Sequence, residues 1–417
     1  MQQSKARGVR VGTLVGRPNN GQQCKFFLSG NCWRGSACRF SHEQSGGSSR
    51  FGCILTSSSS SHGGARLGSN QDPDMRQCNT IDELVQLAYD HLGTISPRGM
   101  AAFWSLLMKH VQNQHGDIRV HLNKQLDAVL CITLKSMYNF DGREISTIAI
   151  SLAKVMKQVE SRRQGAATGS LHRILHSLLV GINSEKKQFI LDKVANSSVL
   201  ILSEFDARSL SNLIYSFGLA EYKPNLIYLC GLVECAPKVE DGRTILGVLA
   251  LAAMSKLHHF NSQDLSNMLW SYAKLESSNL VLFKAAGDLI VVKHDLSEFW
   301  PQHFSNILWA YATAGQSHPK LFSKFGDHIV AMKDLSGFKP QDLSNLLWAY
   351  ATAGESHPLL FQKLAFVAIS RCNKFNPQEI ANSLWAHATV GIIDQHLFTS
   401  FAPAVKSVLG LCCSKCQ

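Results

Sequence analysis

Residues 343–354 carry the phrase that decides the fold, Leu-Ser-Asn-Leu-Leu-Trp-Ala-Tyr-Ala-Thr-Ala-Gly. The phrase recurs with small changes, and the tryptophans that anchor it follow one another at intervals of 39, 39 and 37 residues. These anchors are Trp270, Trp309, Trp348 and Trp385. Two weaker copies are anchored at Tyr215 and Ile150. A repeat of this length is typical of chains that stack one small structural unit many times.

Each repeat has the pattern of two helices. Apolar residues lie five, two and one positions before the anchor and two and three positions after it, which is the spacing of one buried helix face. Prolines mark the starts of first helices and glycines mark their ends. These markers are Pro301, Pro340, Pro377, Gly315, Gly354 and Gly391. Because a lone helix pair cannot bury both of its faces, the units must stack, which predicts an all-α solenoid of helical-hairpin repeats over 80–405 with a period of 37–39.

Two amide side chains recur in the first helix of each repeat. A glutamine lies seven residues before the anchor and an asparagine three before it, so that both share one helix face. These residues are Gln263, Asn267, Gln302, Asn306, Gln341, Asn345, Gln378 and Asn382. Stacked units would align them along one groove, where an amide can donate to and accept from a base edge of RNA. Alternatively, the asparagines satisfy backbone groups between units and the glutamines cap the first turn.

Two further sets of residues recur with the anchors. The tryptophans themselves are predicted to be structural and to lie in the core. Basic residues recur near fifteen positions before four of the anchors, at Lys256, Lys293, Lys333 and Arg371. They either follow the phosphates of a bound strand or form solvated helix ends.

A metal site is predicted near the N-terminus. Cys24, Cys32, Cys38 and His42 have the spacing C-x7-C-x5-C-x3-H. Three thiolates and one imidazole close a tetrahedral shell on one Zn²⁺ and leave no open position, so the site is structural rather than catalytic. Because a module over 21–43 has almost no core, the metal must supply its folding energy.

The segments around this module lack the pattern of a core. Residues 1–20 are predicted to be a basic disordered tail, 44–79 a flexible linker rich in Ser and Gly, and 406–417 a tail that contains cysteines. The first 80 residues hold ten Lys and Arg against three Asp and Glu, whereas the other 337 hold 31 against 27. This excess of positive charge in the N-terminal segment, on a chain that is otherwise nearly neutral, favours a polyanionic partner.

The N-terminal motif resembles the CCCH zinc finger family, many of whose members bind single-stranded RNA. The resemblance implies that Phe27 and Phe40 stack on bases, since they match the family's usual aromatic positions. Lys25, Arg34 and Arg39 are candidate phosphate contacts. The family often has an aromatic residue where this chain has Arg34. In the alternative interpretation, the aromatic residues only cover the zinc site.

The repeats over about 140–417 resemble octotricopeptide and heptatricopeptide repeats, the related FAST-kinase-like leucine-rich region, and the repeat protein of the RNA-editing substrate-binding complex. The resemblance implies an RNA-binding protein of an organelle, active in RNA stability, processing or ribosome maturation. Two departures stand out. The proline-rich signature of many octotricopeptide repeats is missing, and only about 30 residues follow Trp385, too few for the nuclease-like domain of the FAST-type proteins. A catalytic role is therefore not expected.

Together these features favour a non-enzymatic protein that binds single-stranded RNA, with other RNA-processing proteins as further candidate partners. The alternatives are a protein–protein scaffold in an RNA-associated complex and a nuclear or cytoplasmic mRNA regulator. The resemblance favours the mitochondrion or plastid. No small-molecule substrate is expected, because no phosphate loop or hydrolase motif occurs. No membrane span is expected either, since the longest apolar run, Ile245–Met254, is too short.

Overall fold

A computed structural model of the chain describes residues 72–113, 123–164, 184–224, 244–277 and 279–413. These residues belong to one compact unit within Leu67–Gln417. They form fifteen α-helices and several short 3₁₀ turns, and the described residues contain no strand. The predicted zinc finger and most of the predicted linker lie outside them. No helix of the described part is both long enough and apolar enough to span a lipid bilayer.

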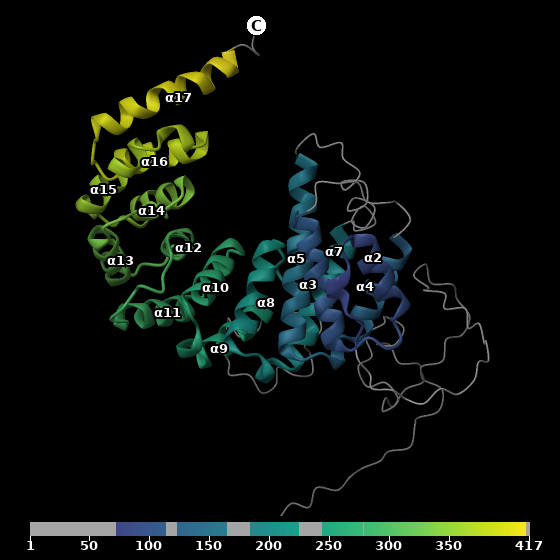
Figure 1. The fold of residues 1–417 in the computed structure, drawn as a ribbon. Helices are drawn as coiled ribbons and strands as arrows, with labels where there is room; N and C mark the ends of the chain where they lie inside the picture. The colour runs from purple at the N-terminus through teal and green to yellow at the C-terminus, as the bar shows by residue number, and fades with distance from the viewer. Residues whose placement is uncertain (1–71, 114–122, 165–183, 225–243, 278, 414–417) are drawn as a thin grey trace, which may run out of the picture. The chain divides into compact units, whose positions relative to one another are not determined.

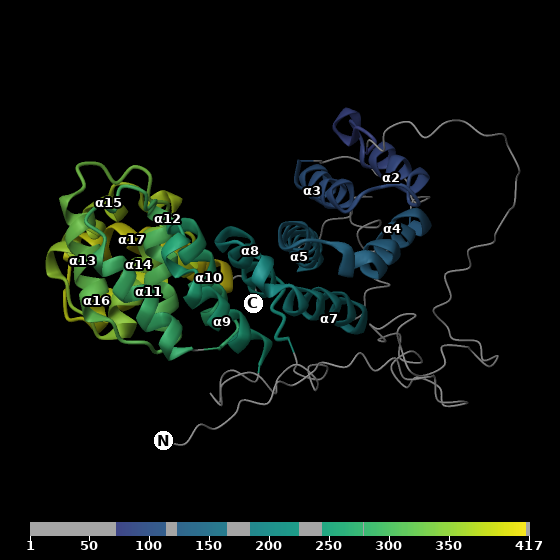
Figure 2. The ribbon, with the colours of Figure 1, turned by 90° about the horizontal axis from the view of Figure 1, so that it is seen from below.

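The helices alternate between two rows (Figure 1). Row A consists of α3 (Pro97–Asn113), α5 (Gly142–Gln164), α8 (Ala207–Leu219), α10 (Ser262–Lys274), α12 (Pro301–Thr313), α14 (Pro340–Ala353) and α16 (Pro377–Thr389). Row B consists of α2 (Ile81–Asp90), α4 (Asn123–Ser136), α7 (Ser184–Leu200), α9 (Ile245–Ser255), α11 (Leu280–Val292), α13 (Pro319–Ala331), α15 (Pro358–Ile369) and α17 (Gln395–Cys413). Each helix packs against the next one in its own row. Figure 2 shows α5 beside its row A neighbour α8 and beside α7 of row B. This sequential packing confirms the predicted all-α solenoid.

The helix ends follow the predicted markers. The helices α12, α14 and α16 have proline in their first turn. Gly315, Gly354 and Gly391 take positive φ angles of 63°, 70° and 71°, the left-handed conformation that ends a helix at low cost in glycine. At the same place after α8 and α10 stand Glu221 and Glu276, with φ angles of 50° and 51°. The first helices of these two units therefore end in a left-handed backbone conformation, which costs free energy in a glutamate.

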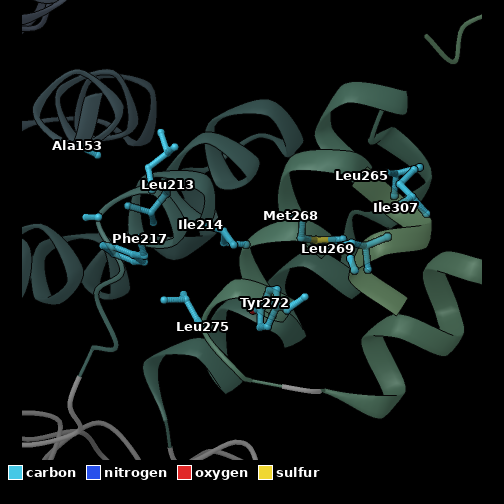
Figure 3. Packing of buried hydrophobic residues seen from close by; sticks show 14 of the residues in the cluster. Ala153, Leu213, Ile214, Phe217, Leu265, Met268, Leu269, Tyr272, Leu275 and Ile307 are labelled. Atoms are coloured by element: carbon cyan, nitrogen blue, oxygen red, sulfur yellow. The ribbon is translucent and has the colours of Figure 1, made fainter. Parts of the chain in front are cut away.

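The buried core residues recur at the same positions in each sequence repeat. A buried phenylalanine precedes every row A helix from α5 to α16 by the same interval. These residues are Phe140, Phe205, Phe260, Phe299, Phe338 and Phe375. Side chains from successive row A helices then pack together, for example Leu213, Met268 and Ile307 of α8, α10 and α12 (Figure 3).

The helical body begins earlier than the sequence predicted. Residues 72–79, assigned to the linker, belong to it: Met75 is buried, and the Asp72 carboxylate accepts hydrogen bonds from the Ser96 N–H at 2.7 Å and from its hydroxyl. Thr80 caps α2 by accepting a hydrogen bond from the Glu83 N–H at 3.2 Å. At the other end, α17 continues to Cys413, so that residues 406–413 extend the last helix rather than forming a tail.

Candidate functional site

The recurring amides lie on one exposed face of row A. All four glutamines are exposed and all four asparagines are half-buried, one pair on each of α10, α12, α14 and α16. The anchoring tryptophan follows each asparagine by three residues and therefore shares this face. We call this surface the amide–indole face. It consists of Gln263, Asn267, Trp270, Gln302, Asn306, Trp309, Gln341, Asn345, Trp348, Gln378, Asn382 and Trp385.

The helix ends and unit contacts near these amides use other residues. The α10 N-terminus is capped by Asn261 together with Asp264, and α16 is capped by Asn376 together with Glu379. Between units, the Ser305 hydroxyl donates to the Asp342 carboxylate at 3.1 Å.

The amide side chains themselves have no such partner. Within the described residues, none of the eight amides makes a side-chain hydrogen bond to the protein. Neither a ladder of asparagines nor capping by glutamines is therefore present there. The half-buried asparagines have donors and acceptors that can meet a ligand.

The prediction that the tryptophans lie in the core is wrong in part. Trp270, Trp309 and Trp348 are half-buried against the core, and 47% of Trp385 is exposed. Two positions after the first three tryptophan anchors lies a fully buried tyrosine: Tyr272, Tyr311 and Tyr350. In the sequence, the anchor follows the asparagine by three residues and the glutamine by seven, so that it lies on the same helix face as these outward-facing amides. This spacing indicates that the indole faces outward.

The aromatic rings of three successive anchors, on α8, α10 and α12, form a run. The rings of Tyr215 and Trp270 meet edge to face at 5.6 Å between centroids, and those of Trp270 and Trp309 lie 6.5 Å apart at 32°. The amide–indole face thus alternates flat aromatic surface with neutral donors and acceptors. Those are the groups that bind unpaired bases, through stacking and through contacts with base edges.

The recurring basic residues near fifteen positions before the anchors have structural partners in three of four cases. Lys256 donates to the Ser203 carbonyl at 3.1 Å, and Arg371 donates to the Phe338 carbonyl at 2.9 Å. Lys293 pairs with Glu298 at 2.8 Å. Lys333 is exposed. Lys256 and Arg371 therefore cap backbone carbonyls and Lys293 forms an ion pair, so phosphate contacts are not needed to account for these three residues.

The predicted zinc ligands and the finger's candidate RNA contacts lie outside the described residues. Those residues are Cys24, Cys32, Cys38, His42, Lys25, Phe27, Arg34, Arg39 and Phe40. Within the described helical body, no group of three or more His, Cys, Asp or Glu side chains is placed to hold a metal ion.

Comparison with known families identifies the N-terminal module. Residues 22–44 match the family described as zinc finger C-x8-C-x5-C-x3-H type (and similar). The chain has seven residues in the first interval instead of eight. Three cysteines and one histidine suit zinc by their chemistry, and a finger of this family implies a bound zinc ion and suggests RNA binding in general. No curated protein matches the chain.

Proposed function

We propose that this chain is a non-catalytic protein that binds single-stranded RNA through two sites, the zinc finger and the amide–indole face. The observation that carries the proposal is the set of eight outward-facing amides, which make no side-chain hydrogen bond to the described residues and alternate with partly exposed indoles. None of their polar atoms is both buried and unpaired, so they remain open to water or to a ligand, and their recurrence on one face of four helices supports a bound ligand.

The indoles and the amides would contribute differently to RNA binding. An indole can stack on any unpaired base and contributes about 1–3 kcal/mol per base, with little selection among bases. An amide offers a donor and an acceptor to a base edge and can therefore discriminate. The tryptophans would supply affinity along the strand, and Asn267, Asn306, Asn345 and Asn382 would supply sequence preference.

The finger would add affinity of another kind. It holds one structural zinc ion through Cys24, Cys32, Cys38 and His42, and it lies in the strongly basic first 80 residues. Phosphate neutralisation by this segment would capture RNA of any sequence. Because both sites belong to one chain, binding at one raises the effective concentration of RNA at the other.

We place this activity in RNA processing or stability in a mitochondrion or plastid, on the resemblance of the repeats alone. Imaging of the tagged full-length chain in cells tests the compartment. A nuclear or cytoplasmic signal would favour an mRNA regulator led by its finger instead.

The binding test uses the full-length chain with Cys38→Ser, which removes a zinc ligand and so the folded finger but keeps the basic residues around it, and a labelled single-stranded RNA pool of random sequence. We expect binding at low salt that weakens steeply as salt increases, because phosphate contacts release counterions. If this variant binds no RNA at low salt, the helical body is not an RNA-binding surface. The protein–protein scaffold would then replace our proposal for that part of the chain.

A further inference from the structure

One end of the amide–indole face differs in charge from the rest. Four positions after the anchor, α10 carries Lys274, whereas α12, α14 and α16 carry the exposed and neutral Thr313, Thr352 and Thr389. These positions share the helix face of the anchors. Within the described helices from α10 to α16, positive charge at this position is therefore confined to α10.

A second lysine reaches the same end from α5. The Lys157 ammonium lies 6.0 Å from the centre of the Trp270 ring, although α8 comes between α5 and α10 in row A. Lys157 is exposed, and no carboxylate of the described residues pairs with it. A cation over an indole is held by the ring's negative face and remains open to a second, anionic partner.

Lys274 is held by a carboxylate in an unusual backbone position. Its ammonium pairs with Glu221 at 2.9 Å, and Lys223 pairs with Glu276 at 2.6 Å, so that the ends of α8 and α10 are linked twice. The side chain of Glu221 is 68% exposed, and an exposed pair contributes only about 0–1 kcal/mol. This small gain does not explain why glutamates occupy left-handed positions where the later units have glycine.

Glu221 lies among positively charged side chains. The Lys274 ammonium, through its hydrogen bond and its charge, holds the pKa of Glu221 below its ordinary value, and Lys187 and Lys157 add to this effect. Three lysines thus act on one carboxylate. A phosphate that displaced Glu221 from Lys274 would meet the same field.

We propose that Lys157 and Lys274 form a phosphate-binding site at the α5–α10 end of the amide–indole face. In the absence of RNA, Glu221 forms an ion pair with Lys274, and a phosphate of the bound RNA displaces it. The site binds the sugar–phosphate backbone of the single strand whose bases lie against the indoles from Trp270 onward. This inference rests on the proposed function. It gives the strand one anchored end, and hence a register along the repeats, which neutral threonines at the later units cannot supply.

The test compares two double variants of the full-length chain, each with and without Cys38→Ser. Lys157→Ala with Lys274→Ala removes the proposed site. Lys320→Ala with Lys333→Ala removes the same charge from exposed positions on α13 and just after it. The measurement is the Kd for the labelled single-stranded RNA pool of random sequence at several salt concentrations, with circular dichroism to verify folding.

We expect the first pair to weaken binding and to reduce the slope of log K against log salt by about 0.7 for each lysine that contacts a phosphate. The control pair should leave the slope near that of the parent. Glu221→Gln should bind RNA more tightly than the parent, since Lys274 loses its competitor. Slopes that are equal in the two double variants, or a Glu221→Gln variant that binds no more tightly, would overturn the phosphate site while RNA binding itself stands. Absence of RNA binding by the Cys38→Ser parent would instead reject the proposed function.

Discussion

The phenolic oxygen of Tyr350 donates a 2.6 Å hydrogen bond to the carbonyl oxygen of Phe322, which lies in the preceding repeat. The rings of the same two residues meet edge to face, 5.1 Å apart. Tyr311 makes the same pair of contacts with Phe283 one repeat earlier. Adjacent units are therefore joined by a buried polar contact inside an apolar interface, in a manner that repeats along the solenoid.

Tyr350→Phe should keep the packing of this contact and remove the hydrogen bond. We expect a loss of about 1 kcal/mol in the free energy of unfolding, since the Phe322 carbonyl is left with one partner fewer in a buried place. Chemical denaturation of the full-length chain measures this. Tyr138→Phe, at an exposed tyrosine, is the matched control. Equal midpoints for the two variants would show that the hydrogen bond does not couple the repeats.

The glycines of row B are expected to be needed for space rather than for backbone conformation. A Cβ atom on Gly326 would lie 2.3 Å from the His357 ring, which caps α15 by accepting from the Leu360 N–H at 3.3 Å. Gly326→Ala should therefore destabilise the chain by about 1–3 kcal/mol through overpacking. At Gly337, the nearest atom to an added Cβ is 3.5 Å away, so Gly337→Ala is the control. Equal thermal stability of the two variants would contradict this packing.

The last repeat has a histidine where earlier repeats have the coupling tyrosine. His387 is fully buried, its Nδ1 lies 2.9 Å from the Ser383 carbonyl, and its Nε2 lies near the Phe361 carbonyl without a hydrogen bond of normal geometry. Burial lowers the pKa of His387 from its ordinary value of 6.5. Below pH 6.5 the unfolded chain therefore binds a proton more readily than the folded chain, and stability falls as the pH falls.

His387→Tyr should raise the stability of the chain and weaken this pH dependence. Burial also lowers the pKa values of His303 and His328, so that part of the dependence should remain. Thermal unfolding measured above and below pH 6.5 tests both statements. A variant that loses as much stability on acidification as the parent would show that His387 does not titrate with unfolding.

Removal of one zinc ligand should affect the finger alone. We expect Cys38→Ser to abolish the bound zinc of the full-length chain and to leave the melting of the helical body unchanged, because the metal supplies the folding energy of so small a module. Metal analysis of the purified protein measures the first effect and circular dichroism the second. Cys372→Ser, at a half-buried free cysteine of the helical body, is the control. Zinc retained by the Cys38→Ser protein would show that the ligand set is assigned wrongly.

The sequence predicted the repeat well because its pattern reflects burial. Phe338 and Tyr350 have fixed distances from Trp348, and a fixed distance within a helix specifies a face. The sequence failed at Trp348 itself, because an aromatic residue in an apolar phrase was assumed to be core. Its spacing from Asn345 placed it on the outer face. Side-chain partners could not be predicted at all: Lys256 reaches carbonyls, and Glu221 reaches Lys274, across gaps of more than fifty residues.

The central claim is that the amides of row A read the sequence of a bound RNA. The most direct measurement is selection from a random-sequence RNA pool by the full-length chain with Asn306→Ala and Asn345→Ala. The control has Gln362→Ala and Asn373→Ala, which remove exposed amides outside the amide–indole face. We expect the first variant to lose sequence preference while total binding at low salt remains close to that of the control, since phosphate contacts and stacking are kept. Selection of the same sequences by both variants and the parent would contradict the account.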